Sequence, residues 1–105
     1  MARSFPHERL RCYQRAVRVS RWFRSAQFPA GDADLRSQGK RAAASIVLNI
    51  AEGSRMQGRN RRKHFAYAEA SAAEACAVLD VVDLEGGQGM QTELREVAAM
   101  VAALR

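Results

Sequence analysis

Apolar residues recur at every third or fourth position through most of this 105-residue chain, and only two prolines, Pro6 and Pro29, interrupt the pattern. This spacing gathers apolar side chains on one face of an α-helix, and no segment alternates as a half-buried β-strand does. Breaks in the pattern separate four expected helices, at about residues 7–26, 33–52, 60–84 and 90–104. The sequence therefore predicts an all-α fold.

The connections between the expected helices are short. Phe28-Pro29-Ala30-Gly31 ends the first helix, Gly53 is expected to end the second in the left-handed conformation, and a glycine-rich turn at residues 85–89 precedes the fourth. Short connections favour antiparallel neighbours. With 48% hydrophobic residues, the chain can bury one modest core, so we expect residues 1–105 to form a single up-and-down antiparallel four-helix bundle.

Charge is divided unevenly along the chain. Residues 1–63 contain 15 Lys/Arg and 4 Asp/Glu, a balance of +11, whereas residues 64–105 contain 2 and 7, a balance of −5. Such asymmetry points to a polyanionic partner or to a self-assembly in which unlike surfaces meet. The alternative is that the two halves neutralise one another inside the bundle.

Catalytic, metal and membrane signals are absent from the sequence. No apolar run is long enough to span a bilayer and the first residues lack a signal peptide, so we expect a cytoplasmic protein. Cys12 and Cys76 have no CxxC or histidine partner, which predicts reduced thiols and no metal site. His7 and His64 stand alone without a nucleophile. We therefore expect no enzymatic activity and no cofactor.

A polar strip is expected where the second and third helices meet. On the third helix, Glu74 projects from an apolar face, so it must be either paired or protonated. We expect it to be buried and bonded to the second helix; a pocket acid for general acid–base catalysis is the alternative. The expected network comprises Arg41, Ser45, Asn49, Glu52, Ser71 and Glu74.

The first helix carries arginines opposite its core face. Arg11, Arg15, Arg18 and Arg21 share one arc, and Trp22 falls in the middle of it. A tryptophan outside the core can stack on a nucleic-acid base or anchor a subunit contact. Phosphate binding, subunit contact and a solvated face all remain open for this arc.

A basic turn joins the second and third expected helices. Free N–H groups at a helix start, combined with several cations, can bind phosphate, although the GxxxxGK[ST] spacing of a nucleotide-binding loop is missing. A solvated loop is the alternative. The cations of this turn are Arg55, Arg59, Arg61, Arg62 and Lys63.

Three segments carry a family resemblance. Residues 41–53, RAAASIVLNIAEG, resemble the R-A-A-x-S-I-x-x-N-I-A-E-G signature of the four-helix-bundle proteins encoded in 23S rRNA intervening sequences. Leu10-Arg11-Cys12-Tyr13-Gln14-Arg15-Ala16 is similar to that family's opening, and residues 65–74 are similar to a downstream motif. Gly39 and Ala70 stand where the family usually has leucine and glycine.

The resemblance implies a four-helix bundle that assembles as a ring-like homopentamer, with no established enzymatic activity. The chain is also similar to the accessory proteins of diversity-generating retroelements, which are basic pentamers that engage nucleic acid and a reverse transcriptase. Apolar residues outside the expected core also favour association. They are Ala66, Ala70, Ala73, Ala77 and Val81 on the third helix, with Ala44, Val47 and Leu48 on the second.

Together these features predict a homo-oligomer that binds RNA or DNA through its basic surface. The alternative is a structural or adaptor protein whose ring docks a protein partner.

Overall fold

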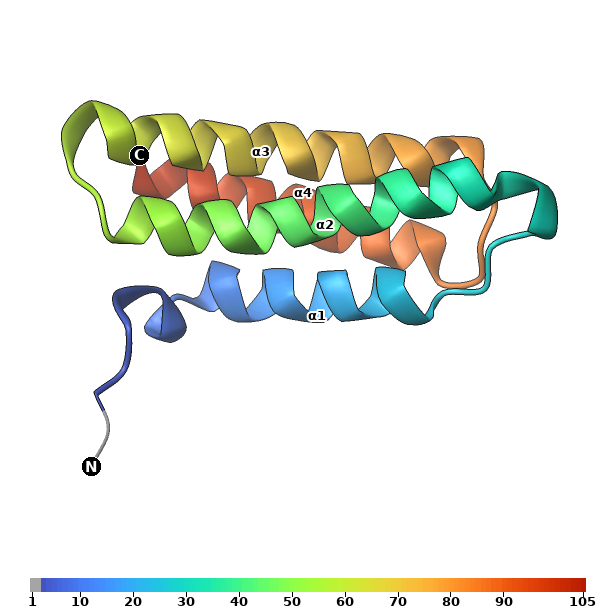
Figure 1. The fold of residues 1–105 in the computed structure, drawn as a ribbon, viewed down its shortest axis with the longest axis horizontal. Coiled ribbons are helices and arrows are strands. Elements are labelled where there is room, and N and C mark those ends of the chain that lie inside the picture. Colours follow the sequence, from blue (N-terminus) through green and yellow to red (C-terminus); the bar gives the residue numbers. More distant parts are fainter. Residues whose placement is uncertain (1–2) are drawn as a thin grey trace.

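The computed structural model describes residues 3–105 and shows four long helices, with no strand in that part of the chain (Figure 1). They are α1 (Arg11–Ser25), α2 (Ala33–Ser54), α3 (Gly58–Val81) and α4 (Gly87–Leu104). Two short 3₁₀ segments, η1 (Pro6–Arg9) and η2 (Ala30–Asp32), precede α1 and α2. Each helix runs antiparallel to the next, and α4 returns to lie against α1. The predicted all-α, up-and-down four-helix bundle is confirmed.

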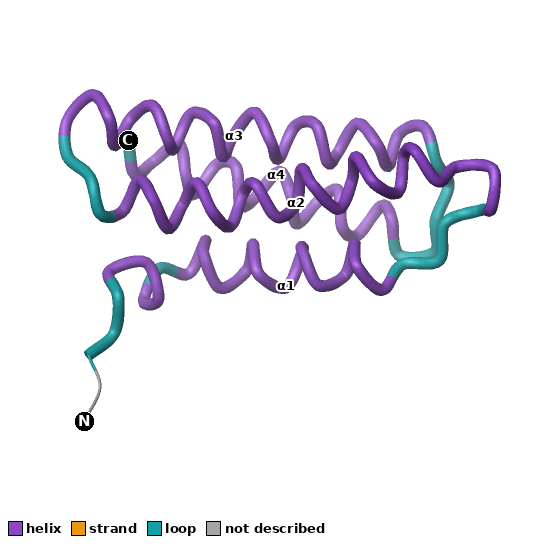
Figure 2. The backbone as a smooth tube through the Cα atoms, viewed as in Figure 1, coloured by secondary structure: helices purple, strands orange, loops and turns teal. Residues whose placement is uncertain are grey.

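The connections gather at the two ends of the bundle (Figure 2). The α2–α3 turn, the N-terminal segment and the C-terminus lie at one end, whereas the α1–α2 and α3–α4 connections lie at the other. No helix within residues 3–105 combines the length and the apolar character needed to cross a membrane.

The core is built from one buried face of each helix. Its largest fully buried side chains are Phe23, Phe65, Ile46, Ile50, Leu94, Val19, Val97 and Val101. Small residues let α2 and α3 approach closely, because alanine adds little bulk between two backbones. Those in the core are Ala42, Ala43, Ala68, Ala72 and Ala75.

Two buried glycines in α2 accommodate aromatic rings. A Cβ atom on Gly39 would lie 2.8 Å from the ring of Phe23, and one on Gly53 would lie 2.7 Å from the ring of Phe65. The prediction that Gly53 ends α2 in the left-handed conformation is wrong. The helix continues to Ser54, and Gly53 has no positive φ. Its role is to make room for Phe65.

Helix boundaries depart from the predicted ones near the turns. Leu10 is extended (ψ 127°), so η1 is separated from α1. Gly86 adopts a left-handed conformation (φ 81°), which reverses the chain early enough for Gly87 and Gly89 to be helical.

Candidate nucleic-acid interface

The α2–α3 turn presents a dense group of exposed cations. Arg55 caps the end of α2, and Gly58, with φ 62°, lets the chain turn directly into α3. The side chains of Arg59, Arg62 and Lys63 are exposed in the first turns of α3. The first N–H groups of a helix and its dipole both favour an anion at this position.

Arg61 differs from its neighbours in the turn. It is half-buried, and its guanidinium carbon lies 4.6 Å from the centroid of the Phe65 ring. This cation–π contact holds Arg61 against the bundle. Of the predicted turn cations, Arg55, Arg59, Arg62 and Lys63 are exposed, whereas Arg61 contributes to packing as well as to charge.

The start of α1 lies at the same end of the bundle as this turn (Figure 1), where η1 packs against α2. Arg11 is exposed at the first position of α1, and Arg18 is exposed two turns further along. We call Arg11, Arg18, Arg55, Arg59, Arg62 and Lys63 the basic surface.

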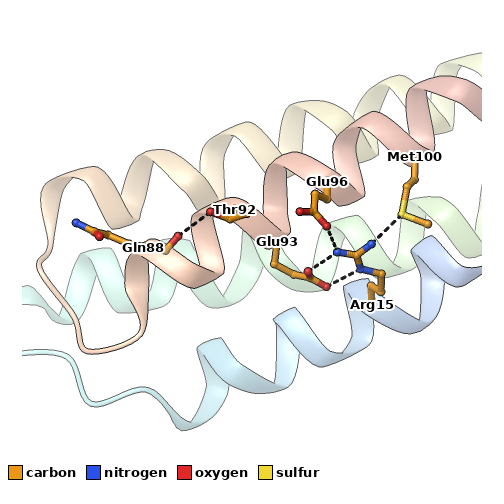
Figure 3. Close-up of polar contacts among 6 residues, drawn as sticks. All are labelled: Arg15, Gln88, Thr92, Glu93, Glu96 and Met100. Atoms are coloured by element: carbon orange, nitrogen blue, oxygen red, sulfur yellow. Dashed lines mark hydrogen bonds and ion pairs between the residues drawn. The ribbon is translucent and has the colours of Figure 1, made fainter.

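Arg15 does not belong to this surface. Its guanidinium faces α4, where Nε donates to a carboxylate oxygen of Glu93 at 2.8 Å and Nη2 pairs with the other Glu93 oxygen at 2.5 Å (Figure 3). Nη2 also pairs with Glu96, and Nη1 lies 3.4 Å from the Met100 sulfur. The hydrogen bonds from Arg15 lower the pKa of the Glu93 carboxyl, and those from both carboxylates raise the pKa of Arg15.

The Arg15–Glu93 pair should contribute to stability in a pH-dependent way. The folded-state pKa of Glu93 lies below its ordinary value of 4.5, so the contribution is complete above that pH and is lost as the pH falls through the folded-state value. We expect Glu93→Gln to lower the free energy of unfolding by about 1 kcal/mol at neutral pH.

Urea unfolding at neutral pH and at about pH 3 would measure this difference, because a carboxylate contribution is lost only in acid. The variant should lose less stability than the parent on acidification. Glu96→Gln is the control and should have a smaller effect, since Glu96 is 54% exposed. Equal acid sensitivity of Glu93→Gln and the parent would contradict the assignment.

Trp22 lies away from the cations of the α2–α3 turn. The indole is half-buried, packs against the core and meets the Phe23 ring edge-on, with centroids 5.1 Å apart. Its Nε1 atom would lie 3.6 Å from a Cβ on Gly86, so it lies beside the α3–α4 turn. Trp22 is thus at the opposite end of the bundle from the α2–α3 turn, so it does not share one site with the cations of that turn.

Internal neutralisation does not account for the positive charge. Of the 17 lysines and arginines, only Arg15 and Arg105 form ion pairs within residues 3–105. Arg105 binds Glu69, with Nε 2.6 Å from a carboxylate oxygen. The cations of the basic surface form no ion pair in the described part of the chain, although Arg18 lies close enough to Glu93 for its charge to help lower the pKa of that carboxyl.

Comparison with protein-family models identifies one match. The model of the 23S rRNA-intervening sequence protein covers residues 8–103, nearly the whole chain. The chain belongs to this family. A search of curated proteins finds no significant match.

In this 23S rRNA-intervening sequence protein, a chain of hydrogen bonds joins α2 to α3. The hydroxyl of Ser71 donates to that of Ser45 at 2.9 Å, and the Asn49 amide donates to both the hydroxyl and the carbonyl of Ser45, each at 3.0 Å. The Asn49 carbonyl oxygen lies 3.0 Å from Nδ1 of His64. Sequence reasoning missed His64, although its seven-residue separation from Ser71 places both on one face of α3.

Three residues of the expected network lie outside this chain of hydrogen bonds. Glu74, Arg41 and Glu52 are exposed and make no side-chain hydrogen bond or ion pair with any other described residue. The prediction that Glu74 is buried is wrong for this chain, because Glu74 lies on the outer arc of α3. Arg41 instead borders a shallow surface hollow that Arg24 of α1 also lines.

The hydrogen-bonded residues do not resemble a metal or acyl-transfer site. No three His, Cys, Asp or Glu side chains in residues 3–105 gather closely enough to hold a metal ion. Both cysteines are free, Cys12 in the core and Cys76 half-buried, and burial raises the pKa of the Cys12 thiol. A buried thiol of raised pKa is a poor nucleophile, so Cys12 is suited to packing.

Proposed function

We propose that this 23S rRNA-intervening sequence protein is a non-catalytic, cytoplasmic homo-oligomer that binds RNA through its basic surface. The observation that carries the proposal is the concentration of exposed cations without acidic partners at one end of the bundle, around the α2–α3 turn. Cations on a fixed scaffold bind the phosphate backbone by releasing its condensed counterions.

The start of α3 adds to this attraction. Gln57, at the N-cap, makes no side-chain hydrogen bond to the first turn, so a phosphate oxygen can accept from those N–H groups. One subunit offers few phosphate contacts. A symmetric oligomer repeats them and raises the effective concentration of binding groups along one RNA.

Self-association is supported by two exposed apolar surfaces. On α3, Val81 is 70% exposed and lies on the same outer arc as Ala70 and Ala77. On α2, Leu48 is 66% exposed and borders a groove between α1 and α2 that Val17, Ala44 and Val47 also line. These surfaces lie on different sides of one subunit. Contact between them in neighbouring copies would be heterologous, and such contacts form a ring when the rotation from one copy to the next closes on itself.

Light scattering coupled to size exclusion tests the oligomer, and the ultraviolet absorbance of the same peak tests for bound nucleic acid. We expect a mass several times that of the 11.6 kDa chain, with five copies as the expected stoichiometry from the family resemblance. Nucleic-acid absorbance should fall after a high-salt wash. A monomer that carries no nucleic acid at low salt would contradict both parts of the proposal.

One observation favours the second candidate function, an oligomeric adaptor that docks a protein. An apolar groove of about 300 Å³ runs between α3 and α4, lined mainly by Ala72, Ala73, Cys76, Ala77, Leu94 and Ala98. Pockets with such linings bind apolar side chains. An oligomer of the expected mass with no affinity for RNA would favour this candidate.

A further inference from the structure

The hydrogen bonds between α2 and α3 fix the protonation of one ring nitrogen of His64. A backbone carbonyl can only accept, so the Asn49 amide must turn its NH₂ group toward the Ser45 carbonyl, 3.0 Å away. This orientation directs the Asn49 oxygen at His64 Nδ1, also at 3.0 Å. Nδ1 must therefore carry the proton that the Asn49 oxygen accepts, which leaves Nε2 for contact with another group.

The Nε2 atom faces outward. His64 is half-buried. Its Nε2 atom has no hydrogen-bond partner within residues 3–105, and this atom is not fully buried. The missing Cβ of Gly53 allows this close approach, since a Cβ there would lie 3.2 Å from that of His64. The ring is thus anchored on its inner side and open to solvent on its outer side.

Tyr67 stands beside this ring. The two ring centroids are 6.0 Å apart with an interplanar angle of 86°, and Tyr67 is 52% exposed. An aromatic side chain that a helix leaves exposed, next to cations, provides a stacking surface for an unpaired base. Lys63 immediately precedes His64, so the pair adjoins the basic surface.

From this arrangement we propose that His64 and Tyr67 form a subsite for one nucleotide of single-stranded RNA, a proposal that rests on the proposed function. Tyr67 stacks on the base, and protonated His64 donates from Nε2 to a phosphate oxygen of the same strand. The subsite requires unpaired RNA, because bases in a duplex do not expose a face for stacking.

Fluorescence anisotropy with a labelled oligouridylate of about 20 nucleotides tests the stacking surface. Tyr67→Leu should weaken binding by about 5- to 150-fold, whereas Tyr67→Phe retains the ring and should bind as the parent does. Unchanged affinity of Tyr67→Leu would overturn the subsite. So would dissociation of the oligomer by Tyr67→Leu, because Tyr67 would then be a subunit contact.

His64→Asn tests the imidazole with the fold maintained, because the asparagine amide can still donate to Asn49 while Nε2 is removed. This variant should weaken RNA binding, whereas His7→Asn, which changes the other histidine, should bind as the parent does. Unchanged RNA affinity of His64→Asn would overturn the role of His64. Failure of the proposed function is distinguishable, since the parent itself would then bind no RNA.

Discussion

Simultaneous replacement of Arg59, Arg62 and Lys63 with glutamine should weaken binding of single-stranded RNA by about 100-fold at about 0.1 M salt. Each phosphate contact on a single strand contributes about 0.7 logarithmic units of affinity at that salt concentration, and three contacts are removed. Their side chains are exposed and make no ion pair within the described chain, so their loss should leave the bundle intact.

Anisotropy titrations of the variant and the parent against the same oligonucleotide measure this effect. Arg95→Gln is the matched control: Arg95 is exposed on α4, in the acidic half of the sequence. It should change RNA affinity by much less for each charge removed. Equal losses per charge would mean that net charge alone drives binding and that the α2–α3 turn is not a site.

Phe23→Ala should lower the free energy of unfolding by about 3–5 kcal/mol. Phe23 is completely buried, and its ring lies against the backbone of α2 at Gly39, so truncation leaves a cavity between α1 and α2. A domain of this size has about 5–15 kcal/mol of stability in total. The variant should therefore melt far below the parent in thermal or urea unfolding followed by circular dichroism.

A double-mutant cycle separates two contributions of the Phe23 ring to stability: its close contact with Gly39 and its burial in the core. Gly39→Ala alone should destabilise by about 1–3 kcal/mol, because its Cβ would press on the Phe23 ring at 2.8 Å. The same change should be harmless or stabilising in the Phe23→Leu background. Gly89→Ala, with no atom within 4 Å of the added Cβ, is the control and should stabilise α4. Additive effects of the Phe23 and Gly39 changes would contradict the packing described here.

The helices could be predicted because their periodicity and their breaks are local in sequence. Gly53 shows where local rules fail: a glycine after a helical run suits a C-cap, but here the Phe65 ring from α3 requires the missing Cβ. Gly39 has the same explanation through Phe23. Neither contact can be inferred from the neighbours of the glycine in sequence.

The sequence could predict which cations belong to the candidate site, but it could not predict how their side chains are arranged. Helical spacing groups Arg11, Arg15 and Arg18 on one arc, but it could not show that the packing of α4 against α1 brings Glu93 to Arg15. Glu74 was misplaced because α3 carries alanine on its buried and its exposed faces alike, so apolar neighbours did not distinguish one face from the other. His64 was missed because its partner, Asn49, lies across the α2–α3 turn.

The salt dependence of RNA affinity for the intact parent protein tests the proposed function most directly, provided that the mass is measured in the same buffer. An oligomer should bind single-stranded RNA at low salt, and the logarithm of its association constant should fall with the logarithm of salt concentration. The slope should be steeper than about −2, since each contacted phosphate adds about −0.7. A monomer, an absence of binding at low salt, or a slope near zero would contradict an RNA-binding oligomer.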